Sequence, residues 1–191
     1  KEADFNTYEV ELPDKAPGGV WEYCWNLGVF WGYNPRNYDP KYLQTPSHYI
    51  ETLVKTASLG GNYLLNVGPD PTGRFHPMAV DYLTKIGTWV NANGECIHGV
   101  SGSPFPEQLA WGYVTARPDT LYLIVKDWAA TITVPSMGKA LGKAYLLLDP
   151  DKKSMPISED GKQWTLSLTQ PKPTEPFTVV VVEVEPATVD Q

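Results

Sequence analysis

The sequence predicts an α/β domain followed by an all-β domain, and three observations lead to this prediction. A short apolar segment, residues 63–67, lies between glycines and between two segments with the apolar spacing of helices. This helix–strand–helix order is typical of an α/β sheet or barrel. A linker rich in proline and glycine follows at residues 102–106. Beyond it, short apolar segments alternate with turn residues, as in an antiparallel β-sandwich.

The first helix is predicted to begin at Thr45 and Pro46, because a capping hydroxyl followed by proline suits the first helical turn. Gly60 is expected to end it. The apolar residues between these signals have the spacing of one buried helix face. They are Tyr49, Ile50, Leu53, Val54 and Ala57. A second helix is predicted to open at Pro77 and to stop at Gly94.

The segment 63–67 is predicted to be a buried strand of a parallel sheet, since it is too short for a buried helix. Residues 66–73 then form a loop at the end of the strand, where α/β folds place their chemistry. The simpler interpretation is that Asn62 and Asn66 only satisfy buried backbone groups.

The N-terminal part of the chain is rich in acidic and aromatic residues. Residues 1–20 have no helical period and are predicted to form a loop that runs over a site or a surface. Residues 21–34 are predicted to form a short strand and a turn. Their dense aromatic residues belong either to the core or to a surface that packs on sugar rings. Glu22, which lies among them, is either an acceptor for backbone N–H groups or a catalytic group.

Composition excludes several classes of protein. The net charge of −7 argues against a nucleic-acid partner, which requires a basic face. No apolar run approaches the roughly 20 residues that cross a bilayer, so no membrane partner is expected. His48, His76 and His98 stand singly, and no metal or cofactor is expected. Cys24 and Cys96 are interpreted as two buried thiols or as one disulfide.

The second half of the chain reads as strands and turns without a catalytic constellation, and a packing or binding role is expected for it. Its predicted strands are residues 111–115, 120–125, 130–134, 144–148, 164–168 and 177–184. Two helix–strand units in the first half cannot close a parallel sheet by themselves. We therefore expect either a missing partner or the C-terminal part of something longer, with one domain at 1–100 and the other at 101–191.

Four motifs resemble those of α-L-fucosidases of glycoside hydrolase family 29, in the same order and at the same spacing. They are WEYC at residues 21–24, WGYN at 31–34, GGNYLLNVGP at 60–69 and NGE at 93–95. The resemblance covers roughly residues 4–100, and the long central motif is its most specific part. The second half fits the C-terminal domain of that family in kind, without a motif of its own.

The resemblance implies α/β plus all-β architecture: an incomplete C-terminal portion of a (β/α) barrel followed by an antiparallel β-sandwich. It implies a retaining hydrolase that releases L-fucose from glycans, which needs a nucleophile and an acid/base carboxyl group about 5–5.5 Å apart. The family's nucleophile is an aspartate in a Trp-Asn-Asp-type motif, and nothing in this chain matches that motif. The implied partners are thus a fucosylated glycan and an N-terminal catalytic portion, and this chain alone is expected to be inactive.

The resemblance also implies roles for individual residues. The segment DFNTYE at residues 4–9 resembles the family's acid/base segment, which makes Glu9 the candidate general acid/base and Glu11 the runner-up. Trp31 matches the aromatic residue that packs on the apolar side of fucose, including its methyl group. Glu22 matches a position that we interpret as structural.

Two alternatives from other classes remain at this stage. The first alternative to a hydrolase is a non-catalytic carbohydrate-binding module, whose aromatic residues and β-sandwich supply the binding face. The second is an inactive structural fragment. Enzymes of this kind resemble secreted, periplasmic or lysosomal glycan degraders more than cytoplasmic proteins.

Overall fold

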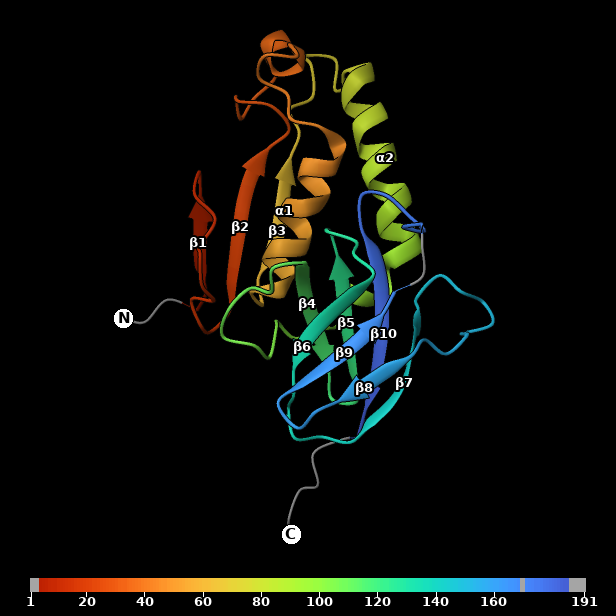
Figure 1. The fold of residues 1–191 in the computed structure, drawn as a ribbon. Helices are drawn as coiled ribbons and strands as arrows, with labels where there is room; N and C mark the ends of the chain where they lie inside the picture. The colour runs from red at the N-terminus through yellow and green to blue at the C-terminus, as the bar shows by residue number, and fades with distance from the viewer. Residues whose placement is uncertain (1–3, 169–170, 186–191) are drawn as a thin grey trace. The chain divides into compact units, whose positions relative to one another are not determined.

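The chain divides between Gly94 and Glu95 into two units, and the computed structural model describes residues 4–168 and 171–185 (Figure 1). The first unit contains two α-helices and one parallel sheet. The second unit contains two antiparallel sheets. The predicted mixture of helix and sheet, with strands and turns alone after residue 100, is thereby confirmed.

The sheet of the first unit has the order β1-β2-β3 and is parallel throughout. Its strands are β1 (Asn6–Glu9), β2 (Trp21–Asn26) and β3 (Asn62–Asn66). Figure 1 shows the three arrows side by side and pointing the same way. The carboxyl ends of all three strands therefore meet at one edge of the sheet.

Helix α1 (Pro46–Ser58) begins and ends where the sequence predicts. The Thr45 hydroxyl accepts a hydrogen bond from the backbone N–H of His48 at 3.3 Å, which caps the first turn. At the other end, Gly60 has a φ of 78°, a left-handed conformation that glycine adopts without a steric penalty. The chain then enters β3, against which α1 packs.

Helix α2 (Pro77–Asn93) is also confirmed, with Pro77 at its first position. His76 serves as its cap, because its Nδ1 accepts a hydrogen bond from the backbone N–H of Met78 at 3.2 Å. The ring of His76 stacks on Tyr38, with 4.0 Å between ring centroids. This contact and the cap agree with a structural role for this histidine.

The prediction of a loop over residues 1–20 is wrong for residues 6–9, which form strand β1. Its pairing with β2 is regular, with Asn6 opposite Trp21 and Glu9 opposite Cys24. Thr7 and Glu9 are exposed, so the segment lacks the apolar alternation that marks a half-buried strand. This edge strand is held by main-chain hydrogen bonds to β2. The pattern of side chains in the sequence cannot predict such bonds.

The prediction that the central segment is a buried strand is confirmed for the strand and its parallel pairing, but not for its burial. Tyr63 and Leu65 are half-buried, whereas Leu64 is 45% exposed. Successive side chains of a strand point to opposite faces. Helix α1 covers the face of Tyr63, and Leu64 lies on the other face.

Gly61 provides a direct test of packing at the start of β3. A Cβ at this position would overlap the indole ring of Trp21, which is only 1% exposed. Gly61→Ala is therefore expected to lower the free energy of unfolding by about 1–3 kcal/mol, the usual cost of overpacking a core. Urea denaturation measures this loss.

Gly87→Ala is the matched control for that substitution. Gly87 lies within α2, and a Cβ there meets no atom of the described residues within 4 Å. Alanine is favoured over glycine inside a helix by about 1 kcal/mol, so Gly87→Ala should stabilise the protein slightly. Equal urea midpoints for the two variants would contradict the contact between Gly61 and Trp21.

The larger sheet of the second unit has the order β4-β5-β10-β7, with antiparallel neighbours. Its strands are β4 (Gly112–Arg117), β5 (Thr120–Val125), β10 (Thr178–Val184) and β7 (Leu141–Leu146). The smaller sheet has the order β6-β9-β8 and is also antiparallel. Its strands are β6 (Thr131–Pro135), β9 (Gln163–Ser167) and β8 (Ile157–Glu159). Every predicted strand is found within a few residues, and β8 is an addition.

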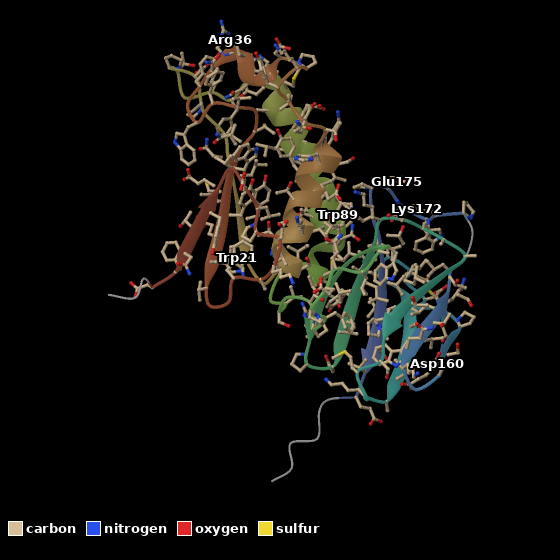
Figure 2. The ribbon with its side chains drawn as sticks, turned by 60° about the vertical axis from the view of Figure 1, so that its left-hand side comes forward. Trp21, Arg36, Trp89, Asp160, Lys172 and Glu175 are labelled. Carbon is tan, nitrogen blue, oxygen red and sulfur yellow. The ribbon has the colours of Figure 1, made fainter. Side chains whose placement is uncertain are left out.

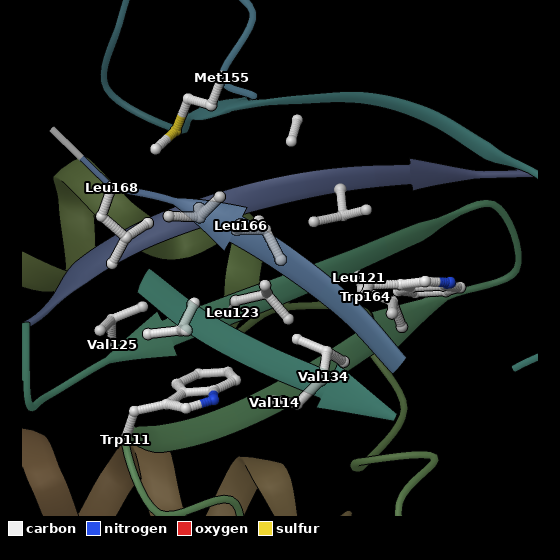
Figure 3. Packing of buried hydrophobic residues seen from close by; sticks show 14 of the residues in the cluster. Trp111, Val114, Leu121, Leu123, Val125, Val134, Met155, Trp164, Leu166 and Leu168 are labelled. Carbon is white, nitrogen blue, oxygen red and sulfur yellow. The ribbon is translucent and has the colours of Figure 1, made fainter. Parts of the chain in front are cut away.

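One hydrophobic cluster joins the two sheets of the second unit (Figure 3). Trp164 and Leu166 come from β9, and Leu123 and Val180 come from β5 and β10; all four are fully buried. Side chains from the inner faces of both sheets therefore form one core. Strand β8 was not predicted, because it has only three residues and is mostly exposed.

Both cysteines are free and buried, which confirms the interpretation as two thiols rather than one disulfide. Cys24 is on β2 in the first unit, and Cys96 lies in the second. Burial raises the pKa of Cys96 to about 12. Burial thus disfavours the thiolate, which is the reactive form of cysteine.

Candidate active site

The carboxyl edge of the parallel sheet gathers the residues that the sequence singled out. Strands β1, β2 and β3 end there at Glu9, Asn26 and Asn66. The loop after β2 continues beyond this edge into a short 3-10 helix, Pro35–Tyr38. Figure 2 shows Arg36 of this helix beyond the strand ends, whereas Trp21 lies at the opposite end of the sheet. Such an edge is the usual position of sites in α/β folds.

The strand register determines which side chains share a face with Glu9. Glu9 pairs with Cys24, and Cys24 pairs with Leu64. Glu22 and Asn26 lie two residues to either side of Cys24 on β2, so they belong to the same face. Glu22 and Asn26 are half-buried on that face, and the row Tyr8–Tyr23–Tyr63 lies on the opposite face.

Glu9 is exposed at the end of β1. Its carboxylate lies close enough to Cys24 to influence that thiol. Burial is the main reason that the pKa of Cys24 is raised, and the charges of Glu9 and Glu22 raise it further. Glu22 is half-buried one row below Glu9, so the two carboxylates lie on one face of adjacent strands.

The chain turns sharply after Glu9. Val10 has a φ of 67°, a strained conformation for a β-branched residue. The hydroxyl of Tyr23 donates a hydrogen bond to the carbonyl oxygen of Val10 at 3.3 Å, and the Tyr23 ring stacks on Tyr63 at 5.9 Å. Glu11 lies beyond this turn and is exposed. The turn thus separates the two candidate carboxylates: Glu9 ends the strand and Glu11 belongs to the loop.

The loop after β2 exposes a group of large apolar side chains. They are Val29 at 49%, Phe30 at 40%, Trp31 at 58% and Tyr33 at 40%. Asn37, which is 2% exposed, holds this loop from below. Its Oδ1 accepts hydrogen bonds from the N–H groups of Val29 and Phe30, at 3.1 and 2.8 Å, and its Nδ2 donates to the carbonyl of Phe30 at 2.9 Å. Exposed side chains thus stand on an ordered backbone.

Sequence reasoning did not find the residues that hold these segments in position. Tyr23 anchors the turn after Glu9, Asn37 anchors the aromatic loop, and Asn66 bonds to the carbonyl of Trp31 at 2.7 Å. In the sequence, Asn66 is recognisable only as an asparagine at a strand end. Asparagine, proline and glycine in a loop indicate a turn, but they do not reveal which distant groups the asparagine side chain will bond.

Residues 4–168 and 171–185 contain no group of three or more His, Cys, Asp or Glu side chains that could hold a metal ion. Over the same residues, no helix is long and apolar enough to cross a bilayer.

The first unit is thus an α/β domain whose carboxyl strand edge carries an exposed carboxylate and an exposed aromatic loop, at the position where such folds usually place their sites. The family model described as Alpha-L-fucosidase matches residues 1–95. The tissue alpha-L-fucosidase of Homo sapiens is 32% identical over 131 residues, or 65% of this chain and 27% of that protein. The alpha-L-fucosidase of Dictyostelium discoideum is 39% identical over 89 residues, or 47% of this chain and 19% of that protein.

Solved structures extend the similarity across both units. Alpha-L-fucosidase isoenzyme 1 from Paenibacillus thiaminolyticus has a TM-score of 0.83 at 28% identity and covers 95% of this chain and 45% of its own. An alpha-L-fucosidase of glycoside hydrolase family 29 from Bacteroides thetaiotaomicron has a TM-score of 0.83 at 28% identity. The match covers 96% of this chain and 43% of that protein. The chain belongs to the alpha-L-fucosidase family of glycoside hydrolases. It spans about a quarter of the length of the human relative and less than half of these solved chains.

Proposed function

We propose that this chain is the C-terminal part of a retaining α-L-fucosidase. Residues 1–100 would be the last part of a catalytic (β/α) barrel, and residues 101–191 a C-terminal β-sandwich. Three parallel strands with helix α1 against one face, and two antiparallel sheets around one core, support this division. The observation that carries the proposal is the family match over residues 1–95, which includes both Glu9 and the exposed aromatic loop.

Glu9 is the general acid/base in this proposal. As an acid it protonates the glycosidic oxygen while the nucleophile, an aspartate from the preceding portion of the barrel, bonds to the anomeric carbon. As a base it then removes a proton from the water that hydrolyses the glycosyl-enzyme. Its position at the carboxyl end of a parallel strand, with an exposed side chain, supports this role.

A similar enzyme supports the retaining mechanism. One alpha-L-fucosidase of Bacteroides thetaiotaomicron, 27% identical to this chain, is described as a trapped covalent intermediate in complex with 2-fluoro-fucosyl fluoride. A covalent glycosyl-enzyme occurs when the second carboxylate acts as a nucleophile, which is the retaining pathway. Because this chain covers 42% of that protein, we assign the nucleophile to the part that this chain lacks.

Trp31 is the substrate-binding residue in this proposal. Its indole is 58% exposed on an ordered loop at the same edge as Glu9. An exposed aromatic face of this kind packs on the apolar C–H face of a sugar and on the C6 methyl group of fucose. The substrate is accordingly the fucosylated end of a glycan, and the second unit has a packing or binding role.

The test is to measure 4-nitrophenyl α-L-fucoside hydrolysis by this chain alone and by the same chain joined to the N-terminal portion of its own gene product. We expect no measurable hydrolysis by the chain alone and full activity of the joined protein, because two carboxyl groups are needed. Hydrolysis at full rate by the chain alone would contradict the proposal that the nucleophile lies outside this chain. Calorimetric L-fucose binding without hydrolysis by the joined protein would instead favour a carbohydrate-binding module.

A further inference from the structure

We propose that Asn66 is a positioning residue that determines how selective the site is for a 6-deoxy sugar. It acts by holding the main chain of Trp31 through its side-chain amide. This inference rests on the proposed function, in which the Trp31 indole packs on the methyl group of fucose. Nothing in the chemistry of the reaction itself requires Asn66, which sits at the last position of β3.

The amide nitrogen of Asn66 makes two hydrogen bonds. It donates to the carbonyl oxygen of Trp31 at 2.7 Å and to Oδ1 of Asn26 at 3.0 Å. Asn26 is the register partner of Asn66 across the parallel sheet. The Nδ2 of Asn26 donates in turn to the carbonyl of Val29 at 3.4 Å. Two strand-end asparagines thus hold both ends of the segment that carries Phe30.

The end of β3 is itself held firmly against this loop. The carbonyl of Asn66 accepts a hydrogen bond from the N–H of Leu27 at 2.9 Å. Two residues later, a Cβ on Gly68 would come within 2.5 Å of the backbone nitrogen of Tyr33 and 2.6 Å of the carbonyl carbon of Gly32. The loop and the strand end therefore meet backbone to backbone, and a movement of one displaces the other.

The exposure of Trp31 makes this carbonyl contact important. A tryptophan that is 58% exposed is not oriented by core packing. Its position depends instead on the backbone that carries it. The Asn66 amide donates to the carbonyl of Trp31 itself, whereas Asn37 holds the carbonyls of Phe30 and Gly32 on either side. Misplacing a substrate-positioning group by about 1 Å costs about a hundredfold in rate. Asn66 therefore controls whether the indole reaches the C6 methyl group.

The test uses Asn66→Asp in the joined, full-length protein. Aspartate has the shape of asparagine but cannot donate, and it brings a negative charge against the carbonyl of Trp31. We measure kcat/KM for 4-nitrophenyl α-L-fucoside and α-L-galactoside, which differ by one hydroxyl at C6. The fucoside preference should fall about tenfold or more, within the range that one apolar contact contributes. Calorimetric affinity for L-fucose should fall while that for L-galactose changes little.

Asn62→Asp is the matched control, because Asn62 lies on the same face of β3 at its other end and is exposed. It should leave the sugar preference unchanged. Asn66→Ala, which removes the donor without adding a charge, and Gly68→Ala, which pushes on the same loop, should both lower the preference. Thermal unfolding verifies that each variant is folded.

The outcomes separate the two proposals. A folded Asn66→Asp protein that keeps the parent's fucoside preference within twofold overturns the role of Asn66. An equal loss in Asn62→Asp overturns it as well, because the effect would then be a general one of added charge. A parent protein that neither hydrolyses nor binds either sugar overturns the proposed function itself.

Discussion

Glu9→Gln is expected to lower kcat/KM of the full-length protein by about 10²–10⁴-fold for an α-L-fucoside with a poor leaving group, such as an alkyl or sugar alcohol. Glutamine occupies the same space but neither donates nor accepts a proton at the glycosidic oxygen. The loss should be much smaller for a 2,4-dinitrophenyl fucoside, whose leaving group departs without protonation. The ratio of the two losses is the measurement that identifies an acid catalyst.

Azide provides a second readout of the same substitution. With the activated substrate, the glycosyl-enzyme of Glu9→Gln forms but lacks the base that activates water. Azide needs no deprotonation, so its addition should restore turnover and yield a fucosyl azide.

Glu11→Gln is the control for Glu9, because Glu11 lies two residues beyond it, past the turn at Val10. It should retain activity within a few-fold of the parent for both leaving groups. If Glu11→Gln instead shows the leaving-group-dependent loss of kcat/KM and Glu9→Gln does not, the acid/base is Glu11. Both carboxylates are exposed, so neither substitution is expected to unfold the protein.

Trp164→Ala is expected to lower the free energy of unfolding of the second unit by about 3–5 kcal/mol. Trp164 is fully buried in the cluster of Figure 3, between two sheets. Its indole N–H donates to the carboxylate of Glu159 at 3.1 Å, and this bond is lost as well. Its strand β9 pairs with both β6 and β8, so a cavity there weakens the whole smaller sheet. Guanidinium denaturation of the whole chain, followed by circular dichroism, measures the loss.

Trp31→Ala is the matched control, since it removes the same side chain from an exposed position. Trp31 is 58% exposed, and substitution there should change stability by about 0.5 kcal/mol or less. In the full-length protein it should nevertheless weaken L-fucose binding, which Trp164→Ala should leave intact under native conditions. Equal denaturation midpoints for the two variants would contradict the core position of Trp164.

The helices could be predicted because their signals are local. Thr45 and Pro46 sit next to the turn that they initiate, and Gly60 sits at the turn that it ends. Capping hydrogen bonds join residues only a few positions apart, so the sequence reports them directly. The strands of the second unit were equally visible, because their apolar residues alternate or cluster between turns.

Strand β1 could not be predicted in the same way. Its side chains are mostly exposed, and its existence depends on main-chain pairing with β2, about 15 residues away. The exposure of Leu64 was missed for a related reason. A short apolar run indicates a strand, but it does not say how many of its faces are covered.

The residues of the candidate site also fall into those that the sequence indicates and those that only the structure reveals. Glu9 and Trp31 came from motifs that resemble a family, which is a comparison of sequences and needs no geometry. Tyr23, Asn37 and Asn66 position them through hydrogen bonds to backbone carbonyls or N–H groups of other segments. An asparagine that is 2% exposed, as Asn37 is, looks in the sequence like any turn asparagine.

The two helices with their ends, most strands of the second unit and the family resemblance in the first 100 residues can be inferred without coordinates. The folded chain is needed to show that Glu9, Cys24 and Leu64 share one row of a parallel sheet, and that Asn66 holds the carbonyl of a residue 35 positions earlier. Helix caps are made within one turn of chain, whereas strand register and loop anchors arise from contacts between distant segments, and only the folded chain brings those segments together.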